Sequence, residues 1–342
     1  MYKRQVHAYA VGNRLGETPE KVRALAPQLV EGPMPLKAWC ERIRDDRLHV
    51  LIHTETGMDP VALRLASLRL APVQCVASGH YNTSGLPTID YFLSGQLVET
   101  PEADAHYSEK LVRLANLGLH YIPSQVSPSN RTRASFGLRE SAVVYYSGHN
   151  LSKYLPQHDD RLARIAAAVG DCQFVFLENR RSSGVTRRFI SRLRHVFEMR
   201  GLDLDRHAIF APRLSSPDFD RLMQLSDVLL DTVGYSGWTV TLESLAFDLP
   251  IVTLPSPFAR GRSGQAILRM MGIPETIAAD MDEYVAIAVR LGLDPNWRRD
   301  LSTRMAADKH RVYEDGDCIR DLEDFLERTA SERPGANGAQ SS

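Results

Sequence analysis

The most informative stretch of the sequence is LSDVLLDTVGYSGWTVTLESLAFDLPIVTLP, at residues 225–255. An apolar run at 228–231 enters a glycine-containing turn, a helix starts near Gly237, and a second apolar run covers 251–254. Apolar runs of about four to six residues between helices are typical of parallel strands that are buried on both faces. The stretch therefore predicts a strand, a helix and a strand of a parallel α/β sheet.

The same alternation runs through nearly the whole chain. Further strands are expected at 6–11, 49–53, 73–77, 89–93, 143–147, 174–177 and 209–212. Helices are expected at 19–30, 35–45, 59–70, 159–169, 183–200 and 217–225. In a chain of 342 residues, this order predicts α/β architecture with two doubly wound, Rossmann-like sheets.

The segment SQVSPSNRTRASFG at 124–137 is polar and lacks periodicity, so we expect a domain boundary there. The predicted domains are 1–130 and 131–330. The tail SERPGANGAQSS at 331–342 has no apolar stripe and is predicted to be disordered.

Composition excludes several classes of protein. Lys and Arg total 41 against 42 Asp and Glu, so no positive field favours a nucleic-acid partner. No run of about 18 apolar residues is present to span a membrane, and the N-terminus lacks the apolar core of a signal peptide. The 4 cysteines occur singly, which predicts reduced thiols in a cytoplasmic protein.

Several sequence motifs are absent. The chain has no GxGxxG after a strand, no GxxxxGK[ST] and no GxSxG, so dinucleotide, P-loop and nucleophile-elbow chemistry is unsupported. Asp-x-Asp pairs occur at 203/205, 218/220, 280/282 and 315/317. Most of them stand where helices begin, so we interpret them as helix caps and expect no metal site.

The helix expected near Gly237 presents free N–H groups behind a strand, which suits a diphosphate. Thr239 and Glu243 are four residues apart and share one face of that helix. Thr239 is thus placed to contact phosphate, and Glu243 to accept hydrogen bonds from ribose hydroxyls. On spacing alone, a capped helix with a solvated Glu is the slightly better interpretation.

Two other stretches carry polar side chains after strands. VVYYSGHNLSKYLP at 143–156 places Lys153 in a polar loop, where no apolar periodicity buries it and its charge can neutralise phosphate oxygens. LAPVQCVASGHYNTSGLPTIDYFLS at 70–94 places His80 between two glycines, as a candidate general acid or base. An ordinary surface lysine is commoner than a ligand, and a structural loop histidine is as good an interpretation of His80.

Read together, these stretches resemble SPINDLY-type O-linked N-acetylglucosamine transferases and the bacterial high-molecular-weight-adhesin glycosyltransferases. The resemblance covers residues 6–330 and is carried by segments in a shared order: ETGMDP at 55–60, RLAPVQ at 69–74, GHYNTSGLPTIDYF at 79–92, AHYSEKLVRL at 105–114, the 150–153 loop, SGWTVTLESLAFDLPIVTLP at 236–255 and FARGRSGQAILRMMGIPETIA at 258–278.

The resemblance implies a GT-B glycosyltransferase, in which two Rossmann-like domains face a cleft that holds the nucleotide-sugar. It implies inverting transfer of N-acetylglucosamine or glucose from a UDP-sugar to protein side chains, without a metal or another cofactor. The expected partners are therefore a UDP-sugar donor and a polypeptide acceptor.

The resemblance also implies residue roles. Lys153 corresponds to the lysine that binds the diphosphate, Asn150 to a donor-binding amide, Thr239 to a phosphate ligand and Glu243 to the ribose ligand. Further donor-site positions are Arg213, Phe219 against the uracil, Gly237, Trp238 (a histidine in relatives) and Arg262. A core Phe is the close alternative for Phe219. His80, with Glu55 as the weaker candidate, is expected to orient or deprotonate the acceptor.

The chain begins at what resembles the second strand of the family's N-terminal domain, so we expect that domain to be incomplete. Two alternatives to protein glycosylation stay open. One is a transferase of the same fold with a small-molecule or glycan acceptor, and the other is a non-catalytic module that binds a nucleotide-sugar.

Overall fold

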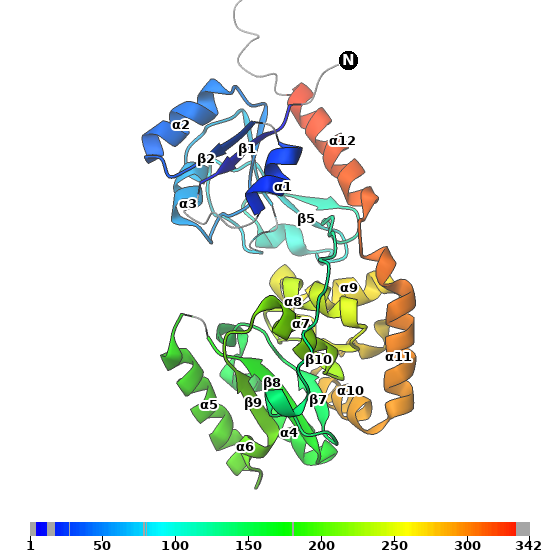
Figure 1. Cartoon of the computed structure of the whole chain (residues 1–342). Coiled ribbons are helices and arrows are strands. Elements are labelled where there is room, and N and C mark those ends of the chain that lie inside the picture. The colour runs from blue at the N-terminus through cyan, green and yellow to red at the C-terminus, as the bar shows by residue number, and fades with distance from the viewer. Residues whose placement is uncertain are drawn as a thin grey trace, which may run out of the picture. The chain divides into compact units, whose positions relative to one another are not determined.

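The computed structural model of the chain describes residues 5–11, 18–26, 28–77, 79, 81–179 and 181–332. The chain divides into two compact units (Figure 1). Unit 1 comprises Met1–Ser94, Glu102–Arg113 and Arg320–Ser342, and unit 2 comprises Gly95–Pro101 and Leu114–Ile319. No helix in the described ranges is long and apolar enough to cross a membrane.

Unit 1 contains two sheets. Strands β1 and β2 pair in parallel, and a second sheet has the order β3-β4-β5-β6. The strands are β1 (His7–Ala10), β2 (Gln28–Glu31), β3 (Val50–His53), β4 (Val73–Ala77), β5 (Tyr91–Gly95) and β6 (Lys110–Leu114). The helices are α1 (Thr18–Leu25), α2 (Leu36–Asp45), α3 (Pro60–Ala66) and α12 (Gly316–Glu332), of which the last begins in unit 2.

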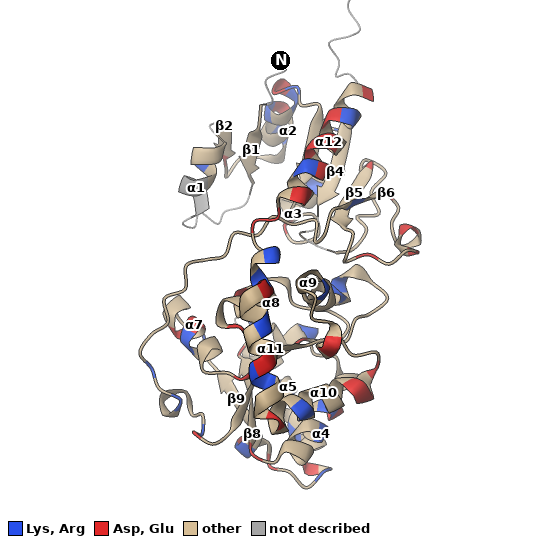
Figure 2. Ribbon diagram, turned by 90° about the vertical axis from the view of Figure 1, so that its right-hand side faces the viewer, with Lys and Arg blue, Asp and Glu red and all other residues tan. Residues whose placement is uncertain are grey.

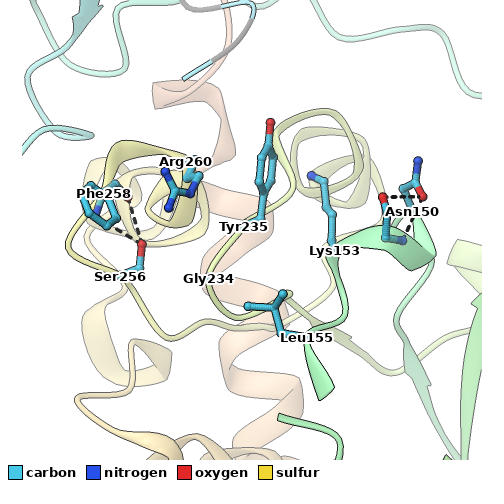
Figure 3. A pocket seen from close by; sticks show the side chains of 9 residues that line it. Asn150, Lys153, Leu155, Gly234, Tyr235, Ser256, Phe258 and Arg260 are labelled. Atoms are coloured by element: carbon cyan, nitrogen blue, oxygen red, sulfur yellow. Dashed lines mark hydrogen bonds between the residues drawn. The ribbon is translucent and has the colours of Figure 1, made fainter. Parts of the chain in front are cut away.

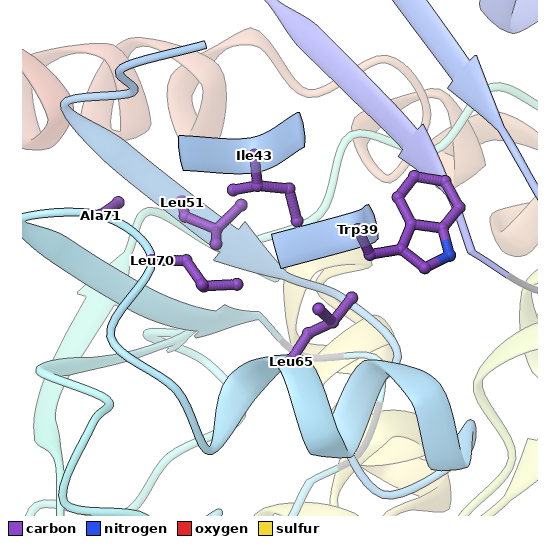
Figure 4. Close-up of a cluster of buried hydrophobic side chains, with 6 residues drawn as sticks. All are labelled: Trp39, Ile43, Leu51, Leu65, Leu70 and Ala71. Carbon is purple, nitrogen blue, oxygen red and sulfur yellow. The ribbon is translucent and has the colours of Figure 1, made fainter. Parts of the chain in front are cut away.

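The core of unit 1 forms around Trp39, which is fully buried on α2. Figure 4 shows Trp39 and Ile43 on α2 beside Leu51 of β3 and Leu65 of α3. An apolar stripe on α2 reaches these neighbours because residues three or four apart share a helix face. This cluster fastens α2 and α3 to the parallel strands.

Unit 2 is a five-stranded sheet with the order β9-β8-β7-β10-β11, in which every printed pair is parallel. Its strands are β7 (Val143–Tyr146), β8 (Cys172–Leu177), β9 (Ala208–Ala211), β10 (Val228–Leu230) and β11 (Ile251–Val252). Counted along the unit, the order is third, second, first, fourth, fifth, which is that of a doubly wound sheet. The order reverses between β7 and β10, and ligands of such sheets bind beyond the carboxyl ends of the strands at that point.

Helices cover this sheet, and α4 packs on β8 while α10 packs on β10 and β11. The helices are α4 (Asp160–Val169), α5 (Ser183–Glu198), α6 (Leu204–His207), α7 (Ser216–Gln224), α8 (Trp238–Ser244), α9 (Ser263–Met271), α10 (Met281–Leu293) and α11 (Pro295–Asp308). Figure 2 shows acidic and basic residues interspersed along α11 and α12, in keeping with the nearly neutral net charge of −1.

Among the differences from the sequence prediction, two concern strands of unit 1. The helix predicted at 19–30 ends at Leu25, because residues 28–31 pair with β1 in the register His7↔Gln28 to Ala10↔Glu31. The strand β6 was missed because its sequence, KLVRL, alternates charged and apolar residues instead of forming an apolar run. An edge strand tolerates this pattern, since it is not covered like a central one.

The domain boundary predicted at residue 130 also differs from the observed units. The polar segment at 124–137 is not a linker, because the Ser127 N–H donates to Asp220 (3.0 Å) and the Ser129 N–H to the Pro217 carbonyl (2.9 Å) of the α7 region. Unit 2 includes this segment and extends back to Leu114.

The chain returns to unit 1 at its end. Phe325 on α12 packs edge-on against Tyr91 of β5, with ring centroids 5.1 Å apart. Helix α12 continues to Glu332, so the first two residues of the tail predicted to be disordered are helical. The rest of that tail lies outside the described residues.

Candidate functional site

The candidate site lies where the strand order of unit 2 reverses. An open pocket of about 600 Å³ is lined by residues that follow β7, β10 and β11: Asn150, Ser152, Lys153, Leu155, Gly234, Tyr235, Ser256, Phe258 and Arg260. These loops leave the carboxyl ends of neighbouring strands. The pocket therefore occupies the position where a doubly wound sheet binds its ligand.

Lys153 is the charged residue on the β7 side of the pocket. It ends a short 3₁₀ turn, Leu151–Lys153, which Asn150 caps by accepting the Ser152 N–H at 3.1 Å. The ammonium of Lys153 donates to the Ser236 carbonyl at 3.0 Å and lies 4.4 Å from the centre of the Tyr235 ring. In Figure 3, Tyr235 stands between Lys153 and Arg260.

Lys153 is thus half-buried, whereas the sequence predicted an unburied loop lysine. Burial lowers the pKa of its ammonium below the ordinary value, and the negative charge of Asp231 opposes this change. The side chain is held at the pocket by a carbonyl and a ring that come from a different loop. A cation fixed in this way is suited to an anionic ligand such as a diphosphate.

The loop that holds Lys153 is organised by Asp231, which is 1% exposed at the end of β10. Its Oδ1 accepts the N–H groups of Thr232 (2.9 Å) and Gly237 (3.0 Å). Its Oδ2 accepts the hydroxyls of Ser236 and Thr253, the latter at 2.8 Å. The sequence analysis did not single out Asp231, although a carboxylate directly after a buried strand and before a glycine-rich turn was a usable signal.

Gly237 is a structural residue of this loop. Its N–H donates to Asp231, so this N–H is not among the free N–H groups that the sequence interpretation expects at the start of the helix. A Cβ at Gly237 would stand 2.3 Å from Cε1 of the buried His149, which explains why glycine is needed here. Helix α8, which follows, has only seven residues, so its dipole is a small source of positive potential.

Glu243 lies on α8 in surroundings that favour its protonated form. Burial raises the pKa of Glu243 to about 7, and the negative charge of Asp220 adds to the shift. Phe219 packs edge-on against Tyr146 at 6.2 Å, and the charge of Glu243 contributes to raising the pKa of Tyr146. Glu243 and Phe219, the predicted ribose and uracil contacts, are therefore both neighbours of Tyr146.

Other predicted residues are dispersed. Thr239 and Arg213 are exposed in unit 2, and Trp238 is half-buried at the start of α8. Arg262 donates to the carbonyls of Val98 (2.8 Å) and Ser256 (3.1 Å), so its guanidinium fastens backbone segments, while Arg260 lines the pocket. The sequence analysis missed Arg260 and Tyr235, which follow strands without any distinguishing spacing.

Of the two acceptor-side candidates, the structure describes Glu55, which belongs to unit 1. Glu55 is exposed in the turn after β3, where its carbonyl accepts the N–H groups of Met58 and Asp59. His80 lies outside the described residues. The roles predicted for both residues stay predictions.

The Asp-x-Asp pairs include helix caps, as expected. Asp203 accepts the Asp205 N–H at 3.0 Å, and Asp280 accepts the Glu283 N–H at 2.9 Å. Within the part of the chain that the structure describes, no group of three or more His, Cys, Asp or Glu side chains is placed to hold a metal ion. The predicted independence from metal stays a prediction.

The fold and the pocket define an α/β protein with a ligand site at the strand-order reversal of its second sheet. Residues 118–313, more than half of the chain, match glycosyl transferase family 41, and the chain belongs to that family. This confirms the resemblance and the GT-B class of fold that the sequence predicted.

Relatives of known name support the same assignment. The chain is 32% identical over 254 residues to the probable UDP-N-acetylglucosamine–peptide N-acetylglucosaminyltransferase SPINDLY of Petunia hybrida, covering 74% of this chain and 26% of that protein. It is 25% identical over 249 residues to a UDP-glucose:protein N-beta-glucosyltransferase of Actinobacillus pleuropneumoniae, covering 72% of this chain and 38% of the relative.

Among solved structures, a mutant O-GlcNAc transferase of Thermobaculum terrenum superposes with a TM-score of 0.85 at 26% identity. The match covers 96% of this chain and 62% of that protein. The chain spans about a quarter of the length of the curated plant relatives that it matches.

Proposed function

We propose that the protein is an inverting, metal-independent glycosyltransferase that moves N-acetylglucosamine or glucose from a UDP-sugar to a polypeptide side chain. One observation carries the proposal: Lys153 is fixed at the strand-order reversal of unit 2, with its ammonium 3.0 Å from the Ser236 carbonyl on the wall of an open pocket. Membership of family 41 and the names of the relatives support the choice of donor and acceptor.

In the proposed reaction, the acceptor atom attacks the anomeric carbon from the face opposite to UDP, and the bond to the diphosphate oxygen breaks. The departing UDP gains negative charge, which the Lys153 ammonium stabilises more strongly than it stabilises the ground state. The acceptor proton passes to a base, for which His80 is the leading candidate and Glu55 the weaker one. Thr239 and Glu243 would bind phosphate and ribose.

A cytoplasmic location is part of the proposal. The cysteines at 40, 75, 172 and 318 are free thiols, and three of them are buried. Unpaired buried thiols suit a reducing compartment.

The experiment is to incubate the full chain with UDP-N-acetylglucosamine or UDP-glucose and a library of Ser-, Thr- and Asn-containing peptides. We expect UDP release that depends on peptide, together with a mass gain of one sugar on the peptide, in the presence of EDTA. Loss of transfer in EDTA that manganese or magnesium restores would contradict metal independence. Tight UDP binding without turnover on any acceptor would instead indicate a binding module, and transfer only to small molecules would exclude a polypeptide acceptor.

A further inference from the structure

We propose that Asp231 is a positioning residue of the donor site, whose buried carboxylate fixes the turn that holds the Lys153 ammonium in place. The inference rests on the proposed function, because it takes Lys153 to be the diphosphate ligand. Asp231 itself is buried and lies behind the pocket wall, so it acts through the loop and not on the donor.

The Asp231 carboxylate accepts hydrogen bonds mainly from its own loop. Four donors converge on it: two backbone N–H groups at positions 232 and 237, and two hydroxyls at positions 236 and 253. These donors span both ends of the turn and include Thr253, which directly follows the neighbouring strand β11. A carboxylate bonded in this way constrains the backbone of the whole 231–237 turn, because moving any donor leaves a buried charge poorly paired.

Ser236 connects the Asp231 carboxylate to the Lys153 ammonium. Its hydroxyl donates to Asp231 and also accepts from the Ser263 hydroxyl (2.7 Å) and the Gly264 N–H (3.0 Å). Its N–H donates to the Arg260 carbonyl at 2.8 Å. The orientation of the Ser236 peptide is therefore fixed, and so is its carbonyl, which receives the Lys153 ammonium at 3.0 Å.

The Tyr235 ring is the second group that contacts the Lys153 ammonium, and its centre lies 4.4 Å from Nζ. The Tyr235 carbonyl accepts the Thr232 hydroxyl at 2.6 Å, and the Thr232 N–H is bonded to Asp231. Both groups that touch the ammonium thus belong to residues that the Asp231 carboxylate holds, directly or through one neighbour. Figure 3 shows Lys153 and Tyr235 side by side at the pocket.

Charge gives Asp231 a second effect on Lys153. Asp231 is the anionic neighbour that opposes the lowering of the Lys153 pKa by burial. The other titratable groups that interact with Asp231 are His149, whose pKa burial lowers to about 4, and the phenols of Tyr154 and Tyr284, and Arg161 on α4 interacts with the same three side chains. None of these supplies negative charge near neutral pH, because the imidazole is neutral, the guanidinium is positive and the phenols are protonated.

The test is Asp231→Asn, assayed by UDP affinity from about pH 6 to about pH 10. Asparagine keeps the size and one acceptor oxygen, but it turns an amide N–H₂ toward the Ser236 hydroxyl, which already accepts two hydrogen bonds. We expect UDP affinity near neutral pH to fall about tenfold. The alkaline pH at which affinity is lost should move lower by about one unit, because Lys153 loses its neighbouring negative charge.

The matched control is Asp227→Asn, at the opposite end of β10. Asp227 accepts the Val144 N–H (2.8 Å) and pairs with Arg133 (3.2 Å), so its loss should lower the melting temperature without moving the alkaline limit. A second variant, Ser236→Ala, keeps the Asp231 charge but removes the hydroxyl through which Asp231 fixes the Ser236 peptide. It should weaken UDP binding with an unchanged limit, and it serves if Asp231→Asn does not fold.

The outcomes are distinct. If the unaltered protein binds no UDP at any pH, the proposed function fails and this inference fails with it. If the unaltered protein binds UDP while folded Asp231→Asn keeps both its affinity and its alkaline limit, the inference alone is overturned. Unchanged affinity in Ser236→Ala would likewise overturn it.

Discussion

The His149 ring packs directly on Gly237, so that a Cβ on Gly237 would lie 2.3 Å from Cε1 and 2.4 Å from Nδ1. His149 lies three residues after the end of β7 and is 1% exposed. Gly237 lies at the end of the turn that follows β10, directly before α8. This contact sets how closely the two loops of the candidate site approach each other. A buried ring has no room to swing aside, so the spacing depends on glycine.

Gly237→Ala is therefore expected to destabilise unit 2 by about 1–3 kcal/mol, the usual cost of overpacking, and to weaken UDP binding. Thermal melting and calorimetric titration with UDP measure the two effects. The matched control is Gly184→Ala on α5, where a Cβ meets only the Ser182 hydroxyl at 3.4 Å. That change should be neutral or slightly stabilising. Equal melting temperatures for both variants would contradict the packing argument.

Lys153→Ala is expected to reduce transfer by about 100- to 1,000-fold, the usual loss when one charge-stabilising donor is removed. Steady-state rates at saturating donor, together with melting, separate this effect from unfolding. Lys309→Ala provides the control, because Lys309 pairs with Asp248 at 2.7 Å in the same unit and does not line the pocket. Near-normal turnover in a folded Lys153→Ala protein would remove Lys153 from the diphosphate site.

Glu243 should couple UDP binding to proton release. Its pKa of about 7 means that about half of the free protein carries this proton at pH 7. A ribose hydroxyl donates a stronger hydrogen bond to the ionised carboxylate, so binding is expected to expel the proton. Affinity should therefore rise as the pH increases from about 6 to about 8.

Calorimetric titrations with UDP in two buffers of different ionisation heat measure the released proton. Glu243→Gln should abolish the release, whereas Glu140→Gln, at an exposed position of the same unit, should keep it. The sign for stability is opposite to that of an ordinary carboxylate. Because the folded pKa lies above the ordinary 4.5, the folded protein binds more protons and loses stability as the pH rises from 4.5 toward 7. Proton release that persists in Glu243→Gln would assign it to another group.

Trp39→Ala tests the independence of the pocket from the core of unit 1. Removing this fully buried ring should cost about 3–5 kcal/mol of unit 1 stability. UDP affinity should stay unchanged under conditions where the variant is folded, because all residues lining the pocket belong to unit 2. Leu63→Ala, at a position that is 42% exposed, should have little effect on either quantity. A large loss of UDP affinity in folded Trp39→Ala would show that unit 1 contributes to binding.

The parallel α/β class, most strand positions and the family could be predicted from the amino-acid sequence alone. These features are local: β4 at Val73–Ala77 was predicted with its observed bounds because its sequence, VQCVA, is mostly apolar, as is typical of a parallel strand that is buried on both faces. The strand β6 was not predicted, because its residues alternate between charged and apolar. The strand β2 was predicted as part of a helix, because only its pairing with β1 makes it a strand. Likewise Lys153 and Glu243 were singled out by their place after a strand or on a helix face and by the order of the family's segments.

The tertiary structure alone decided which groups meet around those residues. The Asp231 carboxylate accepts the hydroxyl of Thr253, which is 22 residues away, and the Lys153 ammonium donates to a carbonyl that is 83 residues away. Such contacts depend on parallel strands that bring their carboxyl ends to one edge, which no short window of sequence contains. The pKa values of these residues also depend on the tertiary structure. The sequence predicts a solvated Lys153, whereas burial in the folded protein lowers the pKa of Lys153 and raises that of Glu243.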